Sequence, residues 1–149
     1  MNKKDKLVVK IVNKSSNELP KYQTIGASGL DIMAFLEKKI TLKPLERILV
    51  PTGIFLEIPL GWEGQIRPRS GLAYKHGITC LNTPGTIDSD YRGELKVLLV
   101  NLSNDPYEIS NGDRIAQLVF ASYDQVVWDE VLSLNESKRN EGGFGSTGI

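Results

Sequence analysis

Short apolar runs recur along the chain and are separated by turn-forming steps. The runs cover residues Leu7–Val12, Leu30–Leu36, Ile48–Ile58, Trp62–Ile66, Ile78–Leu81, Leu95–Leu102, Ile115–Ala121 and Val126–Val131. The breaks between them contain Asn-Gly, Pro-Gly, Leu-Gly and Asp-Pro steps. Many short strands at this spacing are typical of an all-β sandwich or barrel. The pattern therefore predicts strands at these runs.

Helical periodicity is almost absent from the sequence. Only Ser70–His76 predicts a short helix, and no segment stays periodic for long enough to form the crossover of a βαβ unit. A parallel sheet is therefore not expected. Residues 139–149 are rich in Gly, Ser and Thr, which predicts a flexible C-terminal tail. We expect a β domain over residues 1–138 and a mobile tail over residues 139–149.

Length and composition narrow the class of protein further. A chain of 149 residues suits one domain with a hydrophobic core, and a formal net charge of zero gives no reason to expect nucleic acid or a membrane as partner. The single cysteine, Cys80, excludes an internal disulfide and fits a reducing compartment. The first apolar run is too short for the core of a signal peptide, and no stretch reaches membrane-spanning length. We therefore expect a cytoplasmic protein.

The two basic residue types are distributed unevenly. Nine of the twelve lysines lie in the first 43 residues, whereas five of the six arginines lie beyond residue 60. These five are Arg67, Arg69, Arg92, Arg114 and Arg139. Arginine suits bidentate contacts with phosphate or carboxylate groups. Surface arginines or structural ion pairs explain the same spacing equally well.

Several kinds of chemistry are not supported. The only histidine, His76, cannot complete a zinc site with one cysteine, and nothing around it suggests a Ser-His-Asp triad. The segment Gly143–Gly148 matches the dinucleotide fingerprint GxGxxG. That motif has to follow a strand and open a helix, and only Ile149 follows it here, so we expect no dinucleotide site.

Three segments suit phosphate chemistry. Pro68–Gly71 places a guanidinium, a hydroxyl and an unhindered backbone N–H in consecutive positions, which can cradle a phosphate. Asn82–Gly93 predicts a hairpin tip in which either of two acids could be a general base and a tyrosine could pack on a sugar or base. Asn111–Gln117 runs from a turn into a strand. Taken singly, the three segments are better explained by a solvated loop, an acidic turn and a capped strand.

Taken together, these segments resemble the homotrimeric dUTPase family from about Ser28 to Thr147. Five ordered motifs carry the resemblance: Ser28–Ile32, Pro68–Ala73, Leu81–Glu94, Gly112–Val119 and Arg139–Gly148. The second and third are the most specific, and the ordered set is more specific than either. Thr83 stands where many members have a smaller residue, and we expect no functional consequence.

The resemblance implies a jelly-roll fold and a homotrimer in which each site draws on three subunits. It implies Mg²⁺-dependent hydrolysis of dUTP to dUMP and pyrophosphate, which keeps uracil out of DNA and supplies dUMP for thymidylate synthesis. Asp88 would be the catalytic residue, activating a water for in-line attack on the α-phosphate. Mg²⁺ would bind through the triphosphate oxygens and water, without direct protein ligands.

The resemblance also implies which residues contact the substrate. They are Arg69, Ser70, Gly71, Asn82, Gly85, Thr86, Ile87, Tyr91, Lys96, Gln117, Arg139, Phe144, Gly145, Ser146 and Thr147. Tyr91 would pack under the deoxyribose and exclude a 2′-hydroxyl, Asn82 would hydrogen-bond the uracil, and Phe144 would stack over it. Arg69, Ser70, Gly71 and Gln117 would hold the α- and β-phosphates, whereas Arg139, Ser146 and Thr147 would hold the γ-phosphate. Asp31, Asp90 and Arg114 would not contact the substrate but would hold these residues in position.

Two other functions compete with dUTP hydrolysis. A dCTP deaminase shares the fold in family terms, but it needs a glutamate and different polar groups at the base pocket. A non-catalytic nucleotide-binding trimer has no need for Asp88 and a complete tail together.

Overall fold

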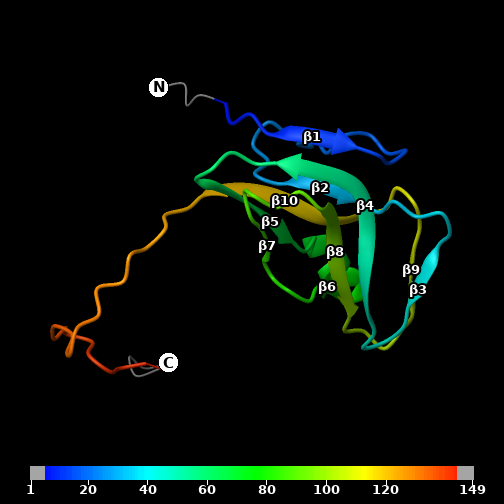
Figure 1. The fold of residues 1–149 in the computed structure, drawn as a ribbon. Helices are drawn as coiled ribbons and strands as arrows, with labels where there is room; N and C mark the ends of the chain where they lie inside the picture. Colours follow the sequence, from blue (N-terminus) through cyan, green and yellow to red (C-terminus); the bar gives the residue numbers. More distant parts are fainter. Residues whose placement is uncertain (1–5, 144–149) are drawn as a thin grey trace.

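The strands of this computed structural model, which describes residues 6–143, all pair in an antiparallel manner. One sheet has the order β1-β4-β8-β6, a second has the order β2-β10-β5-β7, and β3 and β9 form a separate ribbon (Figure 1). In chain order the elements are β1 (Lys10–Asn13), β2 (Leu30–Met33), β3 (Ile40–Leu42), β4 (Arg47–Glu57), β5 (Trp62–Arg67), α1 (Ser70–His76), β6 (Ile78–Cys80), β7 (Gly85–Ile87), β8 (Glu94–Asn101), β9 (Tyr107–Ile109) and β10 (Arg114–Ser122). The predicted all-β, jelly-roll-like fold is confirmed.

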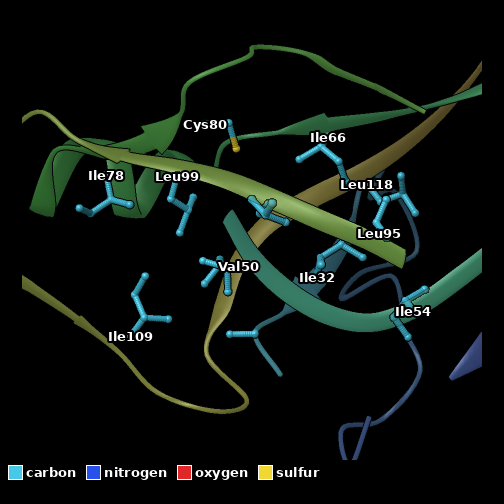
Figure 2. Close-up of a cluster of buried hydrophobic side chains, with 14 of the residues drawn as sticks. Ile32, Val50, Ile54, Ile66, Ile78, Cys80, Leu95, Leu99, Ile109 and Leu118 are labelled. Carbon is cyan, nitrogen blue, oxygen red and sulfur yellow. The ribbon is translucent and has the colours of Figure 1, made fainter. Parts of the chain in front are cut away.

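The two larger sheets enclose one hydrophobic core. Ile32, Ile66 and Leu118 reach it from the second sheet, and Val50 and Leu99 reach it from the first (Figure 2). Each of these side chains is at most 3% exposed. Full burial of one such side chain contributes about 1.5–3 kcal/mol to the stability of the fold. The apolar runs form strands because strand pairing lets each sheet bury one face against the other.

The helix predicted at Ser70–His76 is confirmed as α1. It ends at Gly77, which adopts the left-handed conformation with φ +64° and donates its N–H to the carbonyls of Ala73 and Leu72. A Cβ at Gly77 would lie 2.9 Å from both the Cβ and the backbone N of Ser103. Glycine is therefore needed at this position for its conformation and for the close approach of the chain.

Two sequence-based predictions are wrong. Val126–Val131 forms no strand, and Val127 and Trp128 are 96% and 89% exposed. This segment belongs to an arm, residues 123–143, that contains no strand or helix and runs away from the sheets (Figure 1). The segment Asn82–Gly93 is not a hairpin tip either, because β7 pairs with β5 and β8 pairs with β4 and β6, in the other sheet.

The connection from β7 to β8 therefore crosses from one sheet to the other. Three short strands, β3, β7 and β9, were not predicted from the apolar runs. Each has three residues, which is too few to show an alternating pattern. Within the part of the chain that the structure describes, no helix is long and apolar enough to cross a membrane.

Candidate active site

A buried carboxylate, Asp31, joins the motifs on β2, β10 and the start of α1. Its side chain is 5% exposed and lies between two guanidinium groups. Arg114 Nη1 donates a hydrogen bond to Asp31 Oδ2 at 3.0 Å, and Arg69 Nε forms an ion pair with Oδ1 at 3.3 Å without hydrogen-bond geometry. A buried charge is tolerated only when it is paired, so Asp31 fixes the positions of both arginines.

Strand pairing brings these residues together from distant parts of the sequence. In the second sheet, Gln117 on β10 lies opposite Asp31 on one side and opposite Arg67 on the other. Arg69 Nη1 also donates to the Arg114 carbonyl at 3.0 Å. We call Asp31, Arg69, Arg114 and Gln117 the arginine cluster.

The first residues of α1 are open to solvent beside this cluster. Ser70 and Gly71 are both exposed, and no atom lies within 4 Å of the position of a Cβ at Gly71. A hydroxyl and backbone N–H groups are therefore accessible next to two guanidinium groups. This combination suits an anionic oxygen ligand such as a phosphate.

A second group of predicted residues lies on β7. Gly85 is buried, and a Cβ there would lie 3.2 Å from both Asn82 Nδ2 and Ile66 Cβ. The Asn82 side chain thus lies directly over the Gly85 backbone. Thr86 is exposed, so the segment presents an amide and backbone groups at its surface.

The loop after β7 presents two carboxylates to solvent. It turns tightly, because Tyr91 N donates to the Asp88 carbonyl at 3.1 Å and Arg92 Nη1 donates to the Ser89 carbonyl at 2.7 Å. Asp88 and Asp90 are both exposed and line a hollow of about 380 Å³. Among the described residues, the Asp88 carboxylate has no hydrogen-bond or ion-pair partner, so its oxygens remain available to a water.

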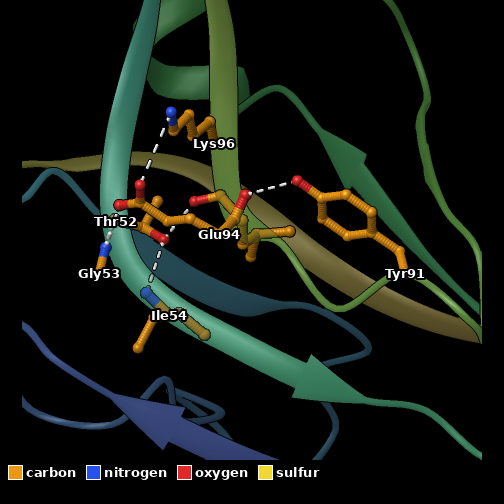
Figure 3. Close-up of polar contacts among 7 residues, drawn as sticks. Thr52, Gly53, Ile54, Tyr91, Glu94 and Lys96 are labelled. Carbon is orange, nitrogen blue, oxygen red and sulfur yellow. Dashed lines mark hydrogen bonds and ion pairs between the residues drawn. The ribbon is translucent and has the colours of Figure 1, made fainter.

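The same loop holds the Tyr91 ring against the start of β8. Tyr91 Oη donates to the Glu94 carbonyl at 3.0 Å (Figure 3). Any Cβ at Gly93 would collide with the Tyr91 ring, so glycine lets the ring keep this position. The Glu94 side chain points the other way, where Oε1 accepts from Gly53 N at 2.9 Å and Oε2 lies 3.7 Å from Lys96 Nζ.

Sequence reasoning assigned no role to Glu94 or to its partners on β4. No signal in the sequence could have revealed the contact, because Gly53 and Glu94 are 41 residues apart. Their meeting depends on the pairing of β4 with β8 and on an irregularity in that pairing between Pro51 and Ile54.

Two parts of the predicted site are not joined to the arginine cluster by a hydrogen bond or ion pair among the described residues. Among the described residues, Asp88 makes no ion pair or hydrogen bond with the arginine cluster. Arg139 lies on the arm, where its Nε donates to the Gly142 carbonyl at 2.7 Å. Phe144, Gly145, Ser146 and Thr147 lie outside the described residues.

The cysteine and the acidic residues limit the available chemistry. Burial raises the pKa of the Cys80 thiol to about 11, so Cys80 stays protonated at neutral pH and is not a nucleophile. Within residues 6–143, no three His, Cys, Asp or Glu side chains gather in a way that could hold a metal ion.

The fold and the site define an all-β sandwich protein with an arginine–carboxylate site suited to phosphate groups. The family model described as dUTPase matches residues 15–148. The deoxyuridine 5'-triphosphate nucleotidohydrolase of Finegoldia magna is 62% identical over 140 residues, which is 94% of this chain and 98% of the relative. The protein of the same name from Cytophaga hutchinsonii is 61% identical over 94% of this chain and 91% of its own length. The chain belongs to the dUTPase family, the dUTP diphosphatases, and is therefore an enzyme.

Solved structures agree on the fold. A mutant dUTPase of Staphylococcus bacteriophage 80alpha with dUpNHpp superposes with a TM-score of 0.86 at 24% identity, over 95% of this chain and 99% of that one. A mutant dUTPase from phage phi11 of S. aureus, described as coordinating a structural Mg(II) ion, gives a TM-score of 0.78 at 21% identity, over 87% and 99% of the two chains. At this level of identity the similarity establishes the architecture.

Proposed function

We propose that this chain hydrolyses dUTP to dUMP and pyrophosphate by attack of water on the α-phosphate. The observation that carries the proposal is the 62% identity to a deoxyuridine 5'-triphosphate nucleotidohydrolase over 94% of the chain. In a cytoplasmic setting the reaction keeps uracil out of DNA and supplies dUMP for thymidylate synthesis.

The arginine cluster and the start of α1 hold the α- and β-phosphates. Arg69 is held by the buried Asp31 and by the Arg114 carbonyl, directly before the exposed Ser70 and Gly71 in the sequence, and Gln117 lies opposite Asp31 on the adjoining strand. A nucleoside triphosphate carries about four negative charges, so cationic groups have to offset them as charge develops on the leaving group. Asp31 and Arg114 position Arg69 for this task.

Mg²⁺ fits the same site without a protein cage. The described acidic residues do not cluster around one point, whereas a triphosphate supplies the hard oxygen ligands that Mg²⁺ prefers. When bound, Mg²⁺ withdraws charge from the phosphate oxygens and supports the departure of pyrophosphate. All proton handling falls to the protein.

Asp88 orients and deprotonates the attacking water. Its carboxylate is exposed at the edge of a hollow and lacks a described partner, which suits a group that has to accept a proton from water. Asp90 lies two residues away and shapes the same turn. An in-line attack requires one water held at one face of the α-phosphorus, and a single fixed carboxylate is sufficient for that.

Substrate selection falls to β7 and the Tyr91 loop. Asn82, with the backbone of Gly85, Thr86 and Ile87, recognises the uracil edge, and the Tyr91 ring excludes a 2′-hydroxyl. A polar pocket rejects a wrong base strongly, because a mismatched edge leaves buried groups unpaired. Lys96, which lies beside Glu94, belongs to the same side of the site.

A homotrimer completes each site. Two observations support this assembly: among the described residues no hydrogen bond or ion pair joins Asp88 to the arginine cluster, and the arm exposes Val127, Trp128 and Leu132 to solvent. Apolar side chains in such a row are stabilised when they dock on another surface. Residues 139–149 would then close over the nucleotide as a lid, with Arg139, Ser146 and Thr147 on the γ-phosphate and Phe144 on the base.

A substrate panel tests the proposal. With Mg²⁺, the protein should turn over dUTP and leave dCTP, dTTP and UTP largely unreacted. Formation of dUTP from dCTP would instead identify a deaminase. Tight binding of dUTP with no product would identify a non-catalytic binding protein.

A further inference from the structure

We infer that Glu94 is a positioning residue for sugar selection, because it connects the Tyr91 ring to an irregularity in β4. This inference rests on the proposed function, in which Tyr91 excludes a 2′-hydroxyl. Glu94 is the first residue of β8, and its backbone and side chain make contacts on opposite sides.

The β4 side of this connection is a rigid bulge. Pairing of β4 with β8 shifts between Pro51 and Ile54, so Thr52 and Gly53 have no opposite residue on β8. Thr52 is 1% exposed, and its Oγ1 donates to the Leu95 carbonyl and accepts from Ile54 N at 3.2 Å. Bulges of this kind redirect a strand and are fixed by their local hydrogen bonds.

Gly53 provides the contact point for Glu94. Its φ is +69°, and a Cβ there would lie 2.8 Å from the Cβ and N of Ser15, so only glycine fits at this point of the bulge. Its carbonyl accepts from Lys14 N at 2.8 Å, and its N–H is satisfied by Glu94 Oε1 at 2.9 Å. Without the carboxylate, this partly buried N–H loses its acceptor, which is unfavourable and favours local rearrangement.

The Tyr91 side of the connection depends on the same residue. Tyr91 Oη donates to the Glu94 carbonyl at 3.0 Å, and the ring lies against Gly93 (Figure 3). Two contacts therefore hold the ring: its packing against Gly93 and its hydrogen bond to the Glu94 carbonyl. The second contact moves with the backbone of Glu94. Because steric exclusion of one hydroxyl depends on placing the ring within a fraction of an ångström, a shift at Glu94 weakens sugar selection before it abolishes turnover.

The Glu94 carboxylate makes two separate contacts, an ion pair with Lys96 and a hydrogen bond with Gly53 N, and two substitutions distinguish them. Glu94→Gln removes the negative charge that faces Lys96 Nζ at 3.7 Å, but its amide oxygen can still accept from Gly53 N. Glu94→Ala removes both. If positioning depends on the hydrogen bond to the bulge, only Glu94→Ala should alter sugar selection.

The test measures kcat/KM for dUTP and for UTP in each variant, with chemical denaturation alongside. We expect the dUTP-to-UTP ratio to fall about tenfold in Glu94→Ala, since one hydrogen bond is lost, and to stay at the wild-type value in Glu94→Gln. Tyr91→Phe should also lower the ratio, and combining it with Glu94→Ala should lower it no further than the larger single effect, because the loss of the Gly53 bond reaches the ring only through the Glu94 carbonyl, to which Tyr91 Oη donates. If Glu94→Ala does not fold, Glu94→Asp replaces it, since one methylene fewer withdraws the carboxylate from Gly53.

Two controls separate positioning from general stability. Glu108→Ala removes an exposed carboxylate that pairs with Lys39, and Leu99→Ala weakens the core in the same strand as Glu94. Neither should change the ratio. An unchanged ratio in Glu94→Ala, or an equal fall in Leu99→Ala, would overturn the inference while leaving dUTP hydrolysis intact. If Tyr91→Ala itself leaves the ratio unchanged, the assignment of Tyr91 fails, and the role of Glu94 fails with it.

Discussion

At the scale of single residues, two aspartates from different motifs of the family differ in burial and in ion pairing. Asp31 is buried between Arg69 and Arg114, whereas Asp88 is exposed and has no described partner. A buried carboxylate that faces two guanidinium groups has little room for a water, while an exposed carboxylate without partners can bind and orient one. The environments alone therefore favour Asp88 as the base and Asp31 as a support.

Replacing Asp88 with asparagine tests that division of roles. Asp88→Asn keeps the size of the side chain but removes the proton acceptor, so kcat for dUTP should fall by roughly 10²–10⁴ or more. KM should change little, because the shape of the site is preserved. Asp90→Asn is the matched control, since Asp90 is exposed in the same turn, and it should reduce kcat less. Full activity of Asp88→Asn would assign the base to another group.

Individual residues were predicted unevenly from the sequence. The identity of Asp88 and Tyr91 could be read from an ordered motif, because their chemistry is local to a loop. The contact between Glu94 and Gly53 could not be read in this way, since it exists only after β4 and β8 have paired around a bulge. Pairing partners and bulges depend on the whole sheet rather than on the residues concerned.

At the scale of elements, strand prediction succeeded where pairing lets an apolar run bury one face. β8 shows this well, because its buried positions face a core that β4, β5 and β10 also line. Val126–Val131 has a similar apolar content but no surface of its own chain to cover, and β-propensity without a partner does not make a strand. Apolar runs therefore indicate where a strand can form, and the available pairing partners decide whether it does.

Helix α1 supplies a test at the same scale, because it carries Ser70 and Gly71 and ends at Gly77. Gly77→Ala should destabilise the fold by about 1–3 kcal/mol, since alanine is strained at φ +64° and its Cβ would press on Ser103. Chemical denaturation at fixed protein concentration measures the change.

Gly61→Ala separates the two contributions to this effect. Gly61 has a φ of +85°, but no atom lies within 4 Å of its Cβ position, so that variant adds conformational strain without a collision. Gly77→Ala should be the more damaging of the two. Equal effects would show that the close approach to Ser103 contributes nothing.

At the scale of the whole molecule, the arm is the least self-sufficient part of the chain. Residues 123–143 contain no strand or helix, and their large apolar side chains are exposed. The hydrophobic core, by contrast, includes no residue of the arm. Shortening the chain at its C-terminus should therefore affect the site rather than the fold.

Deletion of residues 139–149 tests this separation. We expect a folded protein of unchanged oligomeric state with low dUTP turnover, measured by light scattering and a product assay. If the tail serves the site of another subunit, co-refolding the deleted chain with Asp88→Asn should raise activity above that of either parent. Mixed trimers verified by mass that show no such rise would contradict a site shared between subunits.

The position of bond cleavage is the most direct test of the central claim that water attacks the α-phosphate of dUTP. Hydrolysis in ¹⁸O-labelled water, followed by mass spectrometry of both products, shows which phosphorus accepts the oxygen. If water attacks the α-phosphate, the label enters dUMP and pyrophosphate remains unlabelled. Label in pyrophosphate would mean attack on the β-phosphate, and formation of dUDP with labelled orthophosphate would mean attack on the γ-phosphate. Either result would contradict the mechanism proposed for Asp88.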